Sequence, residues 1–117
     1  MIPITDKNYM DVINEFFLKK ETVIIGITPT LSCSVCLQNK DNLEKFFKIN
    51  PDTKINFCFL DYSKYDVLQN YSELNSMTCY PKIIIFYGSW DNTEFIQGLL
   101  TTEKLNEINK KSLNNIL

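Results

Sequence analysis

Apolar side chains near the start of the chain recur with the period of an α-helix. They fall at i, i+3, i+4, i+7 and i+8, with mostly polar residues between them: Tyr9, Val12, Ile13, Phe16 and Phe17. This spacing places all of them in one stripe, so it predicts an amphipathic helix over residues 6–19.

Two later runs of apolar and β-branched residues, 22–27 and 55–60, predict strands. Both runs are too continuous to alternate between a buried and an exposed face, as expected of strands that are buried on both faces. The residues between them predict a second helix over 33–49, after a loop at 28–32. Its apolar face is formed by Cys36, Leu43 and Phe47, with Phe46 beside them, and Pro51 follows its end.

The second half of the chain predicts two more helices and a hairpin. Ser63 is a candidate cap for a short helix with an apolar side of Val67, Leu68 and Tyr71. Residues 83–87 and 93–97 flank a turn at 88–92, which predicts two antiparallel strands, and Gly98 ends the second of them. Thr101 or Thr102 can cap a last helix whose apolar positions are Leu105, Ile108, Leu113 and Ile116. The order of elements predicts an α/β fold, with a central mixed sheet flanked by helices on both faces.

Length and composition indicate the number of domains and argue against two classes of partner, nucleic acid and membrane. A chain of 117 residues with 44% hydrophobic side chains fits a single domain, 1–117. A formal net charge of −2 and scattered lysines argue against nucleic acid as a partner. No stretch approaches the roughly 20 apolar residues that cross a bilayer, and the first residues lack the pattern of a secretion signal, so no membrane partner and a cytoplasmic location are expected.

The chain contains neither histidine nor arginine. The absence of histidine excludes Cys–His and Ser–His nucleophile pairs and removes imidazole as a metal ligand. The absence of arginine removes the bidentate clamp for phosphate or carboxylate. Lysine is therefore the only side chain with a fixed positive charge.

The motif that carries the most chemistry is Cys33-Ser34-Val35-Cys36, which follows a predicted strand and begins a predicted helix. At a helix N-terminus, free amide groups and the macrodipole stabilise a thiolate, so Cys33 is the candidate nucleophile. Cys36 lies one turn further along, near enough to form a disulfide with Cys33. The alternative is a structural zinc half-site or an inert pair, but zinc needs four ligands and the other two cysteines do not form a second pair.

The remaining candidates carry less chemistry. Cys58 lies in a predicted strand between two phenylalanines and is interpreted as a buried hydrophobe. Cys79 precedes Pro81 by two residues, and both a structural and a functional role stay open. Lys40 and Lys82 are interpreted as solvated surface residues, and Trp90 as part of a partly packed turn.

These features together resemble the thioredoxin family over nearly the whole chain, and small bacterial thioredoxin-like proteins most of all. The resemblance rests on the first helix, the Cys33–Cys36 motif, Tyr80-Pro81 before a late strand, and Gly98 before the last helix. It implies that Pro81 is the family's cis-proline and that Tyr80 and Pro81 bind an extended substrate segment.

The sequence also departs from the family's pattern. Ser32 precedes an atypical Cys-Ser-Val-Cys active site, and Asp41 stands near the position of the helix-kinking proline. The family's buried acid, which helps to deprotonate the resolving thiol, would fall at Gly26 or Ile27, where this chain has no carboxylate.

The resemblance implies a monomeric thiol–disulfide oxidoreductase that acts on protein disulfides through Cys33 and Cys36 without a cofactor. A partner reductase or a small thiol would supply electrons. Two alternatives stay open: a glutaredoxin-like enzyme coupled to glutathione, and a non-catalytic adaptor with a thioredoxin fold. Cys79-Tyr80-Pro81 in place of the glutaredoxin Thr-Val-Pro disfavours the first alternative.

Overall fold

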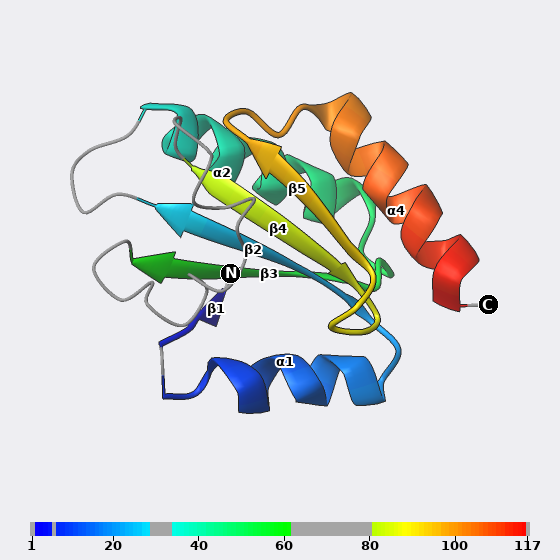
Figure 1. Ribbon diagram of the computed structural model, residues 1–117. Helices are drawn as coiled ribbons and strands as arrows, with labels where there is room; N and C mark the ends of the chain where they lie inside the picture. The colour runs from blue at the N-terminus through cyan, green and yellow to red at the C-terminus, as the bar shows by residue number, and fades with distance from the viewer. Residues whose placement is uncertain (1, 6, 29–33, 62–80, 117) are drawn as a thin grey trace.

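The computed structural model describes residues 2–5, 7–28, 34–61 and 81–116. Its centre is a five-stranded sheet in the order β1-β3-β2-β4-β5 (Figure 1). The strands are β1 (Ile2–Pro3), β2 (Thr22–Thr28), β3 (Ile55–Asp61), β4 (Lys82–Tyr87) and β5 (Thr93–Gln97). β1 and β2 run parallel to β3, whereas β2–β4 and β4–β5 are antiparallel. The predicted mixed sheet is confirmed.

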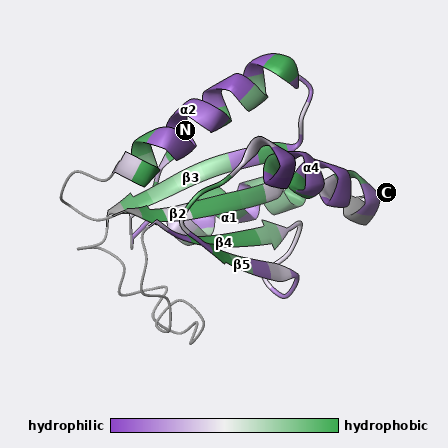
Figure 2. Ribbon diagram, turned by 90° about the horizontal axis from the view of Figure 1, so that it is seen from above, coloured by the Kyte–Doolittle hydropathy of each residue, from purple (hydrophilic) through white to green (hydrophobic). Residues whose placement is uncertain are grey.

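Helices cover both faces of this sheet, as predicted. They are α1 (Tyr9–Leu18), α2 (Ser34–Ile49) and α4 (Thr102–Ile116). α1 lies against one face, and α2 and α4 lie against the other (Figure 1). In Figure 2 the strands are mainly hydrophobic and the helices carry hydrophilic residues along much of their surface.

The two faces of the sheet build separate hydrophobic clusters. Under α1 the buried members include Ile13, Ile25 and Phe86, whereas under α2 and α4 they include Ile24 and Leu43. Consecutive residues of β2 therefore point into different clusters, which is why this strand contains an unbroken apolar run. Every residue of β4 is buried as well.

β3 is less buried than its sequence predicts. The side chain of Phe59 is 37% exposed, although Cys58 and Leu60 on either side of it are buried. Cys58 and Leu60 belong to the cluster under α1, so Phe59 between them lies on the opposite face of the strand, where it joins neither buried cluster. β1 itself was not predicted, since two residues are too few to show a pattern.

The first helix begins at Tyr9 rather than at residue 6. Asn8 precedes it, but the Asn8 side chain makes no capping bond to the helix. Its Oδ1 instead accepts a hydrogen bond from the backbone N–H of Thr5 at 2.8 Å. The preceding residues are thus used in a turn that connects β1 to α1.

The last helix differs from its prediction in which residues face inward. Leu113 is 49% exposed, whereas Ser112 is buried and its hydroxyl hydrogen-bonds with that of Thr22 in β2. The cap is as predicted, because the backbone N–H of Lys104 donates to Thr101 Oγ1 at 3.1 Å. A polar pair therefore replaces the apolar contact expected from Leu113.

The hairpin and the break after it are confirmed. The backbone N–H of Tyr87 donates to the carbonyl of Asn92 at 2.8 Å and closes the turn. Gly98, directly after β5, has φ +86°, a conformation that glycine adopts without the strain of a Cβ. The predicted helix near Ser63 lies outside the described residues.

Candidate functional site

The candidate site lies at the carboxyl end of β2. Ile27, near that end, pairs with Lys82 at the start of the antiparallel strand β4. Pro81 directly precedes Lys82, so the proline lies at the same edge of the sheet. α2 starts at this edge too (Figure 1). The structure thus brings together the elements that carry two of the sequence-predicted site residues, Cys36 and Pro81.

Cys36 occupies the first turn of α2, where it is partly buried and disulfide-bonded. That turn contains no acidic residue, so no carboxylate within it offsets the positive end of the helix dipole. The predictions for Cys33, Cys79 and Tyr80, including the isomer of the Tyr80–Pro81 bond, fall outside the described residues. The arrangement of Cys36 suits sulfur chemistry at a helix N-terminus.

Pro81 and Lys82 are both buried. The carbonyl of Pro81 accepts a hydrogen bond of 2.9 Å from the backbone N–H of Gly98. The interpretation of Lys82 as a solvated residue is wrong: its exposed fraction is only 7%, because β4 is flanked at this point by Ile27 of β2 and Gln97 of β5. Lys40, in contrast, is exposed as predicted.

Asn39 is a polar residue near this edge that sequence reasoning missed. It lies one turn after Cys36 in α2 and is only 3% exposed. Its Nδ2 donates to the carbonyl of Gly98 at 2.9 Å, and its Oδ1 accepts from the N–H of Leu100 at 2.7 Å. Its spacing in the sequence could have indicated this position. Asn39 follows Cys36 by three residues and precedes Leu43 by four, so all three lie on the same, apolar face of the helix.

The expected position of a buried acid is filled by an aromatic ring. Gly26 is buried in β2, and a Cβ added to it would lie 2.9 Å from Cζ of Phe57. Neither Gly26 nor Ile27 offers a proton acceptor in its side chain. The structure agrees with the sequence in placing no carboxylate at these two positions.

Cys58 is a structural cysteine, as predicted. It is free and fully buried in the cluster under α1. Burial raises the pKa of the Cys58 thiol to about 11, so it stays protonated at neutral pH. This thiol takes no part in the candidate site.

Trp90 also matches its prediction of a partly packed turn. Its ring makes edge contacts with Tyr9, Phe17 and Phe86, at centroid distances of 6.2, 5.2 and 5.1 Å. Its Nε1 donates to Oδ1 of Asn14 at 2.9 Å. These contacts fasten the hairpin turn to α1, which accounts for the tryptophan without a binding role.

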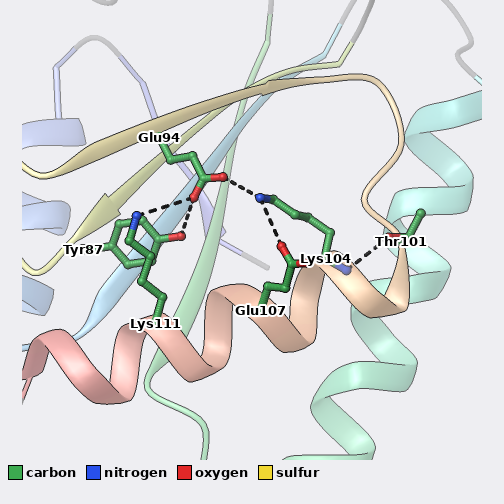
Figure 3. Close-up of polar contacts among 6 residues, drawn as sticks. All are labelled: Tyr87, Glu94, Thr101, Lys104, Glu107 and Lys111. Carbon is green, nitrogen blue, oxygen red and sulfur yellow. Dashed lines mark hydrogen bonds and ion pairs between the residues drawn. The ribbon is translucent and has the colours of Figure 1, made fainter.

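A polar cluster joins α4 to the hairpin (Figure 3). Glu94 accepts hydrogen bonds from the hydroxyl of Tyr87 at 2.7 Å and from Nζ of Lys104. Glu107 lies 3.5 Å from the same Nζ, and Nζ of Lys111 lies 4.6 Å from the centre of the Tyr87 ring. We call these five residues the α4 clamp.

The contacts within the α4 clamp change the pKa values of three of its residues. Burial raises the pKa of Glu94, but the hydrogen bonds from Lys104 and Tyr87 outweigh it and leave that pKa below its ordinary value. The hydrogen bond to Glu94 raises the pKa of Lys104. Burial, assisted by the hydrogen bond to Glu94, raises the pKa of Tyr87. The ion pair therefore stays charged through the neutral range.

The described residues hold neither a cluster suited to a metal ion nor a helix suited to a membrane. They contain no group of three or more cysteine, aspartate or glutamate side chains that could hold a metal ion. None of their helices has the length and apolarity to span a bilayer.

Several of the solved structures similar to this chain are thioredoxins. A chloroplastic thioredoxin z superposes with a TM-score of 0.73 at 18% identity, covering 97% of this chain and 95% of that one. The thioredoxin of Fasciola hepatica gives 0.70 at 17% identity, with 96% and 99% covered. A mutant thioredoxin from Halobacterium salinarum gives 0.66 at 12% identity, with 95% and 88% covered.

The sequence itself matches no protein-family model, and no curated protein matches it. The similarity thus lies in the arrangement of the elements, which agrees over nearly the whole length of these thioredoxins. The mixed five-stranded sheet with helices on both faces agrees with this similarity. This chain has the thioredoxin fold.

Proposed function

We propose that the protein is a thiol–disulfide oxidoreductase that exchanges protein disulfides through Cys33 and Cys36. The observation that carries the proposal is the disulfide-bonded Cys36 in the first turn of α2, directly after the central strand of a thioredoxin fold. Cys58 is free, and the i, i+3 spacing favours Cys33 over Cys79 as the partner of Cys36.

The reaction begins with the reduced protein. The Cys33 thiolate attacks one sulfur of a substrate disulfide, so that the substrate S–S bond breaks, one substrate thiolate leaves, and a mixed disulfide forms. The Cys36 thiolate then attacks the sulfur of Cys33 and expels the second substrate thiolate. The substrate gains two electrons and the protein ends with a Cys33–Cys36 disulfide. A partner reductase or a small thiol returns the two electrons, and no cofactor is required.

Two features support this division of roles. Cys33 precedes the first residue of α2, where helix amides and the macrodipole stabilise a thiolate. Cys36 is partly buried inside the first turn, which suits a thiol that attacks only its neighbour. Tyr80 and Pro81 are proposed to hold an extended segment of the substrate, since Pro81 stands at the same sheet edge as the start of α2.

The direct test is reduction of insulin by dithiothreitol in the presence of the protein. Wild type should accelerate it, and Cys33→Ser should reduce the rate to background. Cys58→Ala, which also removes one thiol, should keep the rate, because that thiol is buried and protonated. Circular dichroism verifies that both variants are folded. Insulin reduction that is equal with and without Cys33 would contradict the proposal.

The same preparation separates the two alternatives. A glutaredoxin-like enzyme would reduce a small disulfide faster with glutathione and glutathione reductase than with dithiothreitol alone, whereas the proposal predicts no such preference. An adaptor would bind its partner equally well after removal of both Cys33 and Cys36. Either result would replace the proposed function by that alternative.

A further inference from the structure

We infer that Asn39 is a positioning residue that aligns the redox helix with the substrate-binding proline. The inference rests on the proposed function, because it concerns how that site meets a protein substrate. It starts from a chain of hydrogen bonds that joins α2 to Pro81 through the backbone after β5.

The first part of this chain belongs to the side chain of Asn39. Both ends of its carboxamide are used: Nδ2 donates to the carbonyl of Gly98, and Oδ1 accepts from the N–H of Leu100, at 2.9 and 2.7 Å. At 3% exposure, water cannot readily replace either bond. The two bonds fix the segment 98–100 in position and in orientation relative to α2.

The second part belongs to the backbone of Gly98. Its carbonyl binds Asn39, and its N–H donates to the carbonyl of Pro81 at 2.9 Å. One residue thus connects to the helix on one side and to the proline on the other. Asn39 lies one turn after Cys36. A shift of its carboxamide would therefore change the position of the first turn of α2 relative to Pro81.

Asn42 provides a matched control. It lies one turn further along α2, and its Nδ2 donates to the carbonyl of Leu100 at 2.8 Å. This bond holds the same segment but does not involve Gly98. Replacing Asn42 removes a helix-to-segment bond of the same kind, while the route from Asn39 through Gly98 to Pro81 stays intact.

The effect of replacing Asn39 on different substrates distinguishes a positioning role from a purely structural one. A small disulfide reacts with Cys33 alone and needs no alignment with Pro81, whereas an extended protein segment needs both. Misalignment should therefore slow only the protein substrate. A general loss of stability would slow both reactions together.

The experiment compares the reduced protein with Asn39→Leu and Asn42→Leu in two reactions, using insulin and a small aromatic disulfide. Asn39→Leu should slow the insulin reaction about ten-fold, with the small-disulfide rate within about two-fold of wild type. Asn42→Leu should leave the ratio of the two rates unchanged. An unchanged ratio in Asn39→Leu would overturn the inference.

Amide hydrogen exchange, followed by NMR, gives a readout that does not depend on activity. Asn39→Leu should speed exchange of the Gly98 N–H about ten-fold, and Asn42→Leu should leave it unchanged. Asn39→Asp, which keeps the acceptor for Leu100 but loses the donor to Gly98, should behave like Asn39→Leu and serves if the leucine variant does not fold. If the wild-type protein is inactive in both reactions, the proposed function is wrong. Hydrogen exchange of the Gly98 N–H still tests the link from Asn39 to Pro81 in that case. An exchange rate that does not change in Asn39→Leu overturns the inference.

Discussion

At the scale of single residues, polar side chains on buried faces decide much of this structure. Asn39, Lys82 and Ser112 are all less than 10% exposed, and each stands where a sequence pattern predicts an apolar residue or an exposed charge. Asn39 and Ser112 find partners 59 and 90 residues away along the chain. Local periodicity can place such a residue on a buried face but carries no information on its distant partner, so these hydrogen bonds could not be predicted from the sequence.

The surroundings of Gly26 could not be predicted from the sequence either. The resemblance in sequence locates it where thioredoxins have an acid, but only the structure reveals that the ring of Phe57 fills the neighbouring space. A side chain at position 26 would have to displace an aromatic ring on the paired strand β3. Glycine is therefore needed here for close packing rather than for an unusual backbone angle.

Gly26→Ala should lower the free energy of unfolding by about 1–3 kcal/mol, because its Cβ would overlap the Phe57 ring. Urea denaturation measures this loss. In a Phe57→Leu background the same substitution should cost less, since the smaller side chain leaves room for the added methyl group. Equal costs in both backgrounds would show that the ring is not the obstacle.

At the scale of elements, the sequence predicted the buried strands, the hairpin and three helices, because each has a long enough periodic run. It missed β1, which has only two residues, and began α1 three residues early because a turn used the preceding polar residues. It predicted the apolar positions Leu105 and Ile108 of α4, which are buried against the sheet, but not the polar contacts of that helix. Those contacts are the α4 clamp and the hydrogen bond between Ser112 and Thr22.

The α4 clamp makes stability depend on pH in a defined direction. The pKa of Glu94 is lower in the folded than in the unfolded protein, so its contribution is present above the unfolded pKa of about 4.3 and is lost as pH falls through the folded value. The raised pKa values of Lys104 and Tyr87 give contributions that are present below about pH 10 and are lost as pH rises further.

Glu94→Gln should lower the free energy of unfolding at pH 7 by about 1 kcal/mol, since it removes the charge of a partly screened ion pair. The difference from wild type should shrink towards pH 3, where the carboxylate takes up a proton. Denaturant titrations between pH 3 and 8 measure it. Glu44→Gln, on the exposed side of α2, is the control and should keep the wild-type pH profile. A Glu94→Gln deficit that is constant over this range would refute the account of the clamp.

At the scale of the whole molecule, the fold brings three chain segments to one edge of the sheet: the end of β2 with the start of α2, Pro81, and Gly98. The order of elements predicted the mixed α/β sheet, the Cys33–Cys36 motif named Cys36 as a candidate site residue, and the resemblance to thioredoxins named Pro81 as another. The linkage from Asn39 to Pro81 was not predictable, because it requires the three-dimensional register of α2 on the sheet.

The absence of an acid at positions 26 and 27 has a kinetic consequence for the proposed function. The proposed resolving thiol, Cys36, then has no carboxylate at the position expected from the resemblance to thioredoxins, and we expect it to lose its proton to solvent or to the substrate. Release of a mixed disulfide should therefore be slow at pH 6 and rise about ten-fold per pH unit until the Cys36 thiol ionises. Single-turnover measurements from pH 6 to 9 follow this release, and a flat profile would point to an internal base.

If the proposed function holds, removing Cys36 should trap natural substrates. Cys36→Ser leaves the attack by Cys33 intact but removes the group that expels the substrate, so mixed disulfides should accumulate in cells and identify the partners. If Cys79 can resolve in place of Cys36, the double variant with Cys79→Ser should trap more. Capture that persists in a Cys33→Ser, Cys36→Ser protein would mean that binding does not proceed through the mixed disulfide.

A redox titration shows whether Cys33 and Cys36 interconvert between dithiol and disulfide, as the proposed function requires. After alkylation, trypsin places Cys33 and Cys36 on the peptide 21–40, Cys58 on 55–64 and Cys79 on 65–82, so each is followed separately. We expect one reversible two-electron transition confined to the peptide 21–40, with a midpoint between about −200 and −270 mV. Alkylation of both its thiols at every potential, or a disulfide that links this peptide to Cys79, would contradict it.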